Sequence, residues 1–377
     1  MSLSINDIIL DFQIRSNWID GEINRLSPKI SNRDYLKHIL HTLSSQANNE
    51  LRAIISLEKV LGIKVEKELI LKLQELDIQI YLVEKYLSAL KREGEKDKLL
   101  AQLLTSTSKK YGMTWITDLI IVTGEDYASL TPTDIPILYC PGVNLYSFIG
   151  MPALYHEMGH TLFARIKSIH GELEKVVDSY VNNKRKTLRP KLGHKMETSS
   201  DLIQIMETYW NRDRLNELFS DIFAAYFCGV PFYYYTLEQT YLSRGKGSID
   251  PTDEHPPWAV RAMASYLSIQ RNKISEQHLK LLDDAHADFN RRYTFTYDTN
   301  VICGAELIQG LIKSSIEQIN KSTHGEGYQR NPDPSPNINY DLGALLNEAL
   351  IKRRDGVTSY DEWEKPFFNK MCEDPRA

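Results

Sequence analysis

Apolar residues recur at helical spacing through the first third of the chain. A run with alternating steps of four and three, the heptad pattern of a coiled-coil seam, comprises Leu69, Leu73, Leu76, Ile80, Val83, Leu87 and Leu90. A similar stripe precedes it, at Leu36, Leu40, Leu43, Ala47, Leu51 and Ile54. Gly62 lies between the two and is a favourable helix end. We therefore expect residues 1–112 to form a helical module built around an antiparallel, coiled-coil-like hairpin.

The seam of this hairpin has two possible uses. It can pack against the rest of the same chain, which is the usual fate of an apolar stripe. Alternatively, it can form an arm that docks a protein partner or a second copy of the chain. A protein partner for residues 1–112 is therefore one prediction of the pattern.

The pattern changes near Gly112. Residues 114–123 (TWITDLIIVT) and 135–140 (IPILYC) are rich in β-branched and aromatic residues and predict two strands, the second at a sheet edge because it contains Pro136. Helical patterns follow at about 150–167, 201–227, 257–271, 275–292, 304–320 and 340–353, with polar loops expected at 182–195 and 322–338.

These patterns predict an α+β fold that is predominantly helical. We expect a catalytic domain with a small β-sheet at 113–321, followed by a loop and a helical tail at 322–377. The whole chain then comprises that domain, the tail and the helical module at 1–112.

Composition narrows the function classes. The chain has 377 residues, 42% of them apolar and 25% charged, and a net charge of −5, which together exclude a disordered chain and make nucleic acid a poor partner. The most apolar stretch, 222–235, is interrupted by Gly229 and Pro231 and is shorter than the ~20 residues of a membrane helix. The four cysteines form no CxxC pair, which favours a reducing compartment. We expect a cytoplasmic protein without membrane insertion.

The strongest chemical signal is the HExxH motif at 156–160. Residues four apart on a helix project to one side, so His156 and His160 can together bind one Zn²⁺ ion. Glu157 can then reach a water molecule at the metal, which is the position of a general base. The alternative is two helix histidines that are satisfied by hydrogen bonds alone.

A catalytic zinc site needs a third protein ligand and an open position. The metzincin pattern would place it at position 166, where this chain has Ile166. Glu217 and Asp221 are four apart in a later helical pattern and share a helix face. Glu217 can complete the ligand set, and Asp221 can accept the second ring N–H of His156 or His160. Otherwise the pair is an amphipathic surface feature.

A third motif, HPPWAVR, follows a turn-rich run at 244–254. His255 can point into the cleft from a loop that enters a helix, and Arg261 can bind a carboxylate or stabilise an oxyanion. The alternative is a proline-rich helix start with exposed charges.

In order, these motifs resemble those of gluzincin metallopeptidases. The segment NELFSDIFA at 216–224 is similar to the third-ligand helix of thermolysin-like peptidases. The order HExGH, ExxxDxxA and HPxxxxR resembles the HtpX-like and CAAX-prenyl endopeptidases, over residues 150–265. The resemblance implies a zincin-like domain with Zn²⁺ held by His156, His160 and Glu217. It further implies Glu157 as general base, Asp221 as the acceptor behind a histidine, and His255 and Arg261 as catalytic residues.

The predicted function is a zinc-dependent peptidase that hydrolyses a peptide or protein substrate with a metal-activated water. Its oxyanion donor would be His255, Arg261 or a tyrosine of the run 233–235, and the strand at 135–140 could pair with an extended substrate. An alternative is a latent regulatory or effector protease that is activated when its helical arm docks a specific protein. A structural or vestigial zinc site is a third possibility, but structural sites usually carry four protein ligands.

Overall fold

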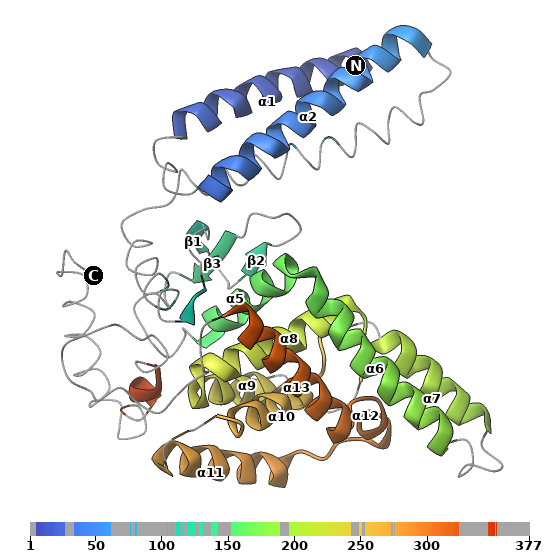
Figure 1. Cartoon of the computed structure of the whole chain (residues 1–377), viewed down its shortest axis with the longest axis vertical. Coiled ribbons are helices and arrows are strands. Elements are labelled where there is room, and N and C mark those ends of the chain that lie inside the picture. The colour runs from blue at the N-terminus through green and yellow to red at the C-terminus, as the bar shows by residue number, and fades with distance from the viewer. Residues whose placement is uncertain are drawn as a thin grey trace. The chain divides into compact units, whose positions relative to one another are not determined.

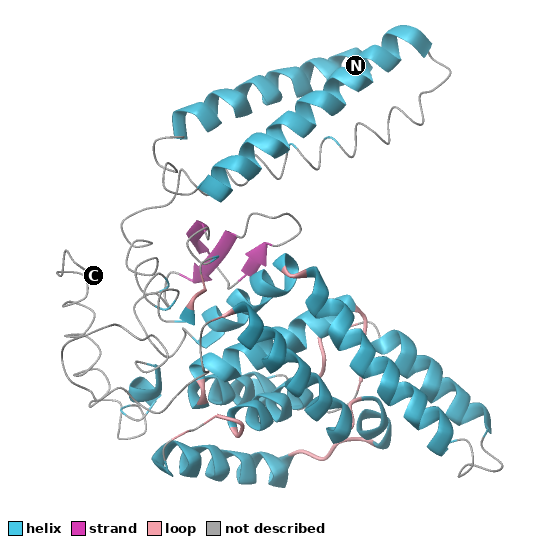
Figure 2. Cartoon of the chain, viewed as in Figure 1, coloured by secondary structure: helices cyan, strands magenta, loops and turns pink. Residues whose placement is uncertain are grey.

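Helices dominate the computed structural model of the chain (Figures 1 and 2). The structure describes residues 5–26, 34–61, 120–124, 128–130, 137–141, 152–188, 196–242, 253–272 and 276–323, with shorter pieces at 76, 80, 104, 107, 111–113, 115, 249–250, 274, 346–350 and 352. It divides into two compact units. The first is Met1–Lys98, Thr117–Val122 and Leu130–Leu138, and the second is Leu99–Ile116, Thr123–Ser129 and Tyr139–Ala377.

An antiparallel pair of helices, α1 (Ile5–Leu26) and α2 (Asp34–Leu61), forms the described core of the first unit. Ser16 donates to Asn48 at 2.6 Å and Ser44 donates to Asp20 at 2.5 Å, so rising numbers on one helix meet falling numbers on the other. The interface buries Ile19, Ile23, Ala47, Leu51 and Ile54.

The helical character predicted for this region is present in α1 and α2, and α1 is a described partner of α2. The expected pairing of α2 with the heptad seam at 69–90 stays a prediction, because most of the seam lies outside the described residues. Within that seam, Leu76 and Ile80 are helical and fully buried, and its other members lie outside the described residues.

Three short strands are present: β1 (Ile120–Gly124), β2 (Ala128–Leu130) and β3 (Ile137–Pro141), hydrogen-bonded in the order β1-β3-β2. Neither the HExxH motif nor the residues around it lie in these strands, because the motif is on a helix. The predicted α+β class with a β-sheet in the catalytic domain is therefore wrong, and the fold class is helical.

Trp115 shows why the strand pattern was misleading. Of the expected strand at 114–123, the described residues 120–123 are in β1, and Trp115 belongs to a helical turn. Its ring is 8% exposed and lies 6.3 Å from the ring of Phe223. Aromatic and β-branched residues fill any core well, so their enrichment does not distinguish a strand from a buried helical turn.

The second unit contains nine consecutive described helices, drawn from green to red in Figure 1. They are α5 (Pro152–Arg165), α6 (Lys167–Leu188), α7 (Met196–Tyr209), α8 (Arg212–Cys228), α9 (Val230–Leu242), α10 (Trp258–Ile269), α11 (Glu276–Arg292), α12 (Tyr297–Ile302) and α13 (Ala305–Ser322). No helix among the described residues is long and apolar enough to cross a bilayer.

Helix α8 is the centre of this unit and contacts α5, α6, α9, α10 and α13. Asn211 caps its first turn by accepting from the backbone N–H of Arg214, and Gly229 ends it with a φ of 75°. Residues 218–228 are all buried, as expected for a helix surrounded on every side. Pro231 then lies in the first turn of α9, where a missing N–H costs no hydrogen bond.

Two helix boundaries differ from the sequence predictions. The polar loop expected at 182–195 is wrong for residues 182–188, because α6 continues to Leu188 and buries Val177, Tyr180 and Val181. Its basic residues occupy the solvated face, and one of them, Arg185, pairs with Glu207 of α7. The helical pattern at 201–227 is also broken, since Trp210 and Asn211 separate α7 from α8.

Candidate metal centre

The HExxH residues lie on α5, which packs closely against α8. Every residue from Pro152 to Phe163 is buried. A Cβ atom at Gly159 would lie 2.6 Å from the Cα atom of Ser220, so only glycine permits this approach of the two helices. The glycine of the motif therefore sets how near the residues of α8 come to the two histidines.

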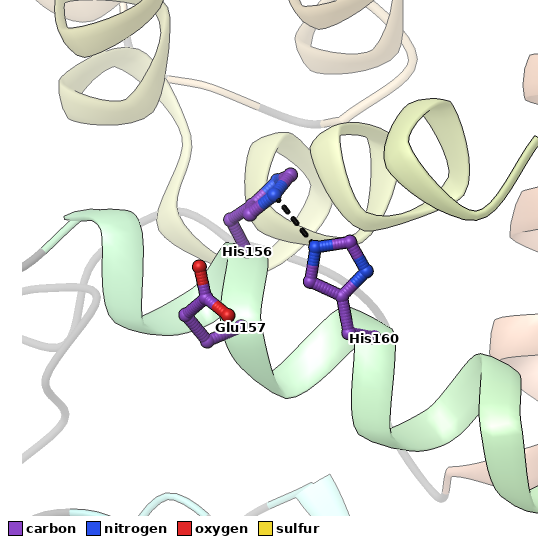
Figure 3. A group of neighbouring side chains, drawn as sticks. All are labelled: His156, Glu157 and His160. Carbon is purple, nitrogen blue, oxygen red and sulfur yellow. Dashed lines mark hydrogen bonds between the residues drawn. The ribbon is translucent and has the colours of Figure 1, made fainter. Parts of the chain in front are cut away.

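His156, Glu157 and His160 gather on one side of α5 (Figure 3). One ligand atom from each lies within 4.8 Å of the others, and the two histidine Nε2 atoms are 3.0 Å apart. All three residues are 7–9% exposed. This buried group could hold a metal ion.

Glu217 of α8 adds a carboxylate to the two imidazoles. Its Oε2 atom is 3.3 Å from Nε2 of His156, and its Oε1 atom is 3.3 Å from Nε2 of His160. A tetrahedral centre with bonds of ~2.0–2.1 Å separates its ligand atoms by about 3.3–3.4 Å. The separations in this trio, 3.0, 3.3 and 3.3 Å, fit such a centre without rearrangement of the backbone.

The opposite ring nitrogen of each histidine also meets a polar group of α8. Nδ1 of His160 is 3.0 Å from the Ser220 hydroxyl. Nδ1 of His156 is 2.9 Å from Oδ1 of Asp221, an ion-pair distance, although the ring N–H is not aligned for a hydrogen bond. Both contacts favour a proton on Nδ1, which leaves the Nε2 lone pairs for a metal.

Arg261 of α10 is buried and contacts the carboxylates of Asp221 and Glu217. It is 2% exposed and donates through Nε and Nη2 to the two oxygens of Asp221, at 2.6 and 2.8 Å. Its Nη2 atom is also 3.3 Å from Glu217, and its guanidinium lies 4.0 Å from the ring centroid of Trp258. The side chain thus holds both carboxylates of α8 in place.

The charges of the site shift several pKa values. Burial alone would lower the pKa of His156, but Asp221 and Glu217 outweigh it and raise that pKa from 6.5 to about 10. Burial alone would raise the pKa of Glu217, but the two histidines and Arg261 hold it far below its usual range. Burial would likewise raise the pKa of Asp221, which Arg261 and His156 hold down.

With neutral histidines, the site carries an excess of negative charge. Glu157, Glu217 and Asp221 are opposed by the single guanidinium of Arg261. Uncompensated charge at buried positions is costly. A divalent cation between the imidazoles and Glu217 would balance this excess, so the donor set and the local charge both suit a metal such as Zn²⁺.

Glu157 differs from the other two acids because its carboxylate has no partner among the residues that the structure describes. It is 8% exposed, and within the described part of the chain the carboxylate makes no hydrogen bond or ion pair. A buried carboxylate without a partner, next to a group of metal-ligand atoms, is available to take a proton.

His255 lies at the rim of the site. Its Nε2 atom is 3.5 Å from Oε1 of Glu217, and 49% of the side chain is exposed. Asp253 accepts from the backbone N–H of His255 at 2.9 Å and lies 3.2 Å from its Nδ1 atom. Arg214 donates to the backbone carbonyl of Asp253 and so fixes the loop to the start of α8.

The structure therefore brings every site residue named from the sequence into one group: His156, Glu157, His160, Glu217, Asp221, His255 and Arg261. Sequence reasoning missed Ser220 and Asp253. Ser220 lies next to Asp221 on a buried helix and carries no spacing signal of its own. Asp253 had one, because an aspartate two residues before another residue can accept that residue's N–H.

Comparisons with protein-family models, with curated proteins and with solved structures found no match for this chain. The metal centre therefore rests on the geometry of its own side chains.

Proposed function

We propose that this protein is a zinc-dependent metallopeptidase. The observation that carries the proposal is the triangle formed by Nε2 of His156, Nε2 of His160 and the Glu217 carboxylate, whose sides match the edges of a tetrahedral zinc site. Two imidazoles and one carboxylate are typical ligands of a catalytic zinc ion, which keeps its fourth position open. Glu157 lies beside this triangle, and no described residue pairs with its carboxylate.

Each residue has a distinct task in peptide hydrolysis. His156, His160 and Glu217 would hold the zinc ion. When bound, zinc supplies Lewis acidity toward a carbonyl group and makes water a nucleophile at neutral pH. Glu157 takes a proton from the attacking water while the new C–O bond forms. It then delivers that proton to the nitrogen as the C–N bond breaks, which gives a carboxylic acid and an amine. The proton left on the carboxylic acid passes to the amine, so the products are a carboxylate and an ammonium group.

Asp221 and Arg261 act through the ligands rather than on the substrate. Asp221 orients His156, and Arg261 fixes Asp221 through two hydrogen bonds. In this proposal Arg261 is a positioning residue, because its guanidinium is buried and already engaged by two carboxylates.

His255 is the exposed member of the group and would contact the bound substrate. Its ring is oriented by Asp253, and its Nε2 atom faces the open side of the Glu217 carboxylate. An imidazole in this position can hydrogen-bond to the peptide next to the scissile bond.

The test is cleavage of an unfolded protein, such as reduced and carboxymethylated casein, by the purified chain. We expect peptide products that disappear with a zinc chelator and return when zinc is added to the dialysed protein. A chain that binds zinc stoichiometrically and leaves unfolded proteins and peptide libraries intact would contradict the proposal of a general peptidase.

A further inference from the structure

Three consecutive tyrosines of α9 have hydroxyl groups in very different surroundings. The Tyr233 hydroxyl lies 2.9 Å from Nδ1 of His286, and the Tyr234 hydroxyl donates to the backbone carbonyl of Leu281 at 3.5 Å. Both partners belong to α11. The Tyr235 hydroxyl, by contrast, has no hydrogen-bond partner in the part of the chain that the structure describes.

The ring of Tyr235 lies near two aromatic residues that themselves contact residues of the metal centre. Phe232 lies 5.7 Å from Tyr235 between ring centroids, and its own ring is stacked on His156 at 6.3 Å and 12°. On its other side, Tyr235 meets Trp258 edge-on at 6.4 Å. Trp258 in turn covers the guanidinium of Arg261. Tyr235 therefore contacts the two aromatic residues that pack on His156 and Arg261, and its side chain is half-buried.

The charged residues of the site also affect the pKa of the Tyr235 hydroxyl. Burial raises the pKa of Tyr235 to about 12, with Arg261 lowering it and Asp221, Glu157 and Glu217 raising it. The hydroxyl consequently keeps its proton at neutral pH and can donate a hydrogen bond. Among the described residues none of these three carboxylates accepts a hydrogen bond from the Tyr235 hydroxyl, so this donor is free for an oxygen of the substrate.

Peptide hydrolysis creates such an oxygen. When the water adds to the scissile carbonyl, that oxygen becomes negative and needs a donor that is already in place. Arg261 cannot serve, since it is 2% exposed and engaged by Asp221 and Glu217. His255 is 49% exposed, and its two ring nitrogens already face carboxylates: Nδ1 lies 3.2 Å from Asp253 and Nε2 lies 3.5 Å from Glu217.

Building on the proposed peptidase function, we propose that Tyr235 is a catalytic residue whose hydroxyl donates a hydrogen bond to the carbonyl oxygen of the scissile peptide as that oxygen becomes negative. The hydroxyl has no partner to give up among the described residues, and its hydrogen bond to the carbonyl oxygen strengthens as negative charge develops there. It therefore stabilises the transition state more than the bound substrate.

The test compares Tyr235→Phe with Tyr234→Phe, a neighbour whose hydroxyl points to α11. We expect Tyr235→Phe to lower kcat by about 10²–10³-fold, the usual loss for one oxyanion donor. Its KM, zinc content and thermal midpoint should stay at the wild-type values, because the ring remains and no protein group loses a partner. Tyr234→Phe should retain kcat.

A second readout does not depend on turnover. A phosphinic peptide carries a tetrahedral anionic centre in place of the scissile amide and imitates the transition state. Calorimetry with this compound should show weaker binding to Tyr235→Phe, by a factor close to the loss in kcat, and unchanged binding to Tyr234→Phe.

The outcomes separate this inference from the function on which it rests. A wild-type chain that holds zinc but hydrolyses no peptide overturns the peptidase and the role of Tyr235 together. An active wild type with a Tyr235→Phe variant within about twofold of it, in kcat and in phosphinate affinity, overturns the role of Tyr235 alone and leaves the peptidase standing.

Discussion

Replacement of Glu157 by Gln is expected to leave the metal bound and to lower kcat by about 10²–10⁴-fold, the range for loss of a positioned general base. Gln keeps the shape of the side chain but cannot accept a proton from water. The carboxylate of Glu157 has no partner among the described residues, so the fold should not sense the change. Steady-state kinetics and elemental analysis on the same preparation measure both effects.

The matched control is Glu238→Gln on α9, since Glu238 is exposed and lies outside the site. This variant should retain both zinc and kcat. A zinc-loaded Glu157→Gln enzyme with activity close to that of the wild type would contradict the assignment of Glu157 as the base. Loss of zinc from Glu157→Gln would instead make Glu157 a ligand.

Replacement of Arg261 by Met should lower the free energy of unfolding of the metal-free protein by about 3–5 kcal/mol, the range for removing one partner of a buried ion pair. Arg261 is the group that offsets Asp221, which is 0% exposed, and it also contacts Glu217. Without the guanidinium, Asp221 stays buried with only His156 as a charged partner. Urea unfolding of the chelated protein, followed by circular dichroism, measures the loss.

Two further variants make this measurement specific. Arg271→Met removes an exposed arginine near the end of α10 and should change the unfolding free energy by less than about 0.5 kcal/mol. The double variant Arg261→Met with Asp221→Asn removes both charges and should recover part of the loss, because the two residues are in direct contact. A loss of less than 1 kcal/mol for Arg261→Met alone would contradict a buried pair of this strength.

The grouping of the candidate metal residues could be predicted from the sequence because it follows from helix periodicity. His156 and His160 share a face of one helix, and Glu217 and Asp221 share a face of another. The spacing i, i+4 thus determined which side chains of each helix act together. It could not predict that the two faces meet, a contact that depends on Gly159 and Ser220 at the crossing of α5 and α8.

The contacts of Arg261 and Ser220 could not be predicted from the sequence. An arginine at the start of a helix reads as a surface charge or a substrate contact, and only the packing of α10 on α8 places it under Asp221. Ser220 contacts His160 across 60 positions of chain, a distance that no local pattern encodes. Such roles follow from tertiary packing.

The fold class was mispredicted for a related reason. β-Branched and aromatic segments predict a catalytic-domain sheet, whereas the site is built from α5, α8, α10 and the loop that carries His255. The basic residues at 182–188 favour a loop in the sequence, but they lie on the solvated face of α6, whose opposite face is apolar and buried. In both cases the residue types alone suggest the wrong element, because the secondary structure depends on which side chains point toward the core.

The central claim is that His156, His160 and Glu217 hold one catalytic zinc ion. The measurement that tests it most directly is elemental analysis of zinc per chain in the wild type and in Glu217→Ala, purified side by side and checked for equal helix content by circular dichroism. We predict about one zinc per wild-type chain and its loss from most Glu217→Ala chains. A wild type without metal, or a folded Glu217→Ala variant with its full zinc content, would contradict the claim.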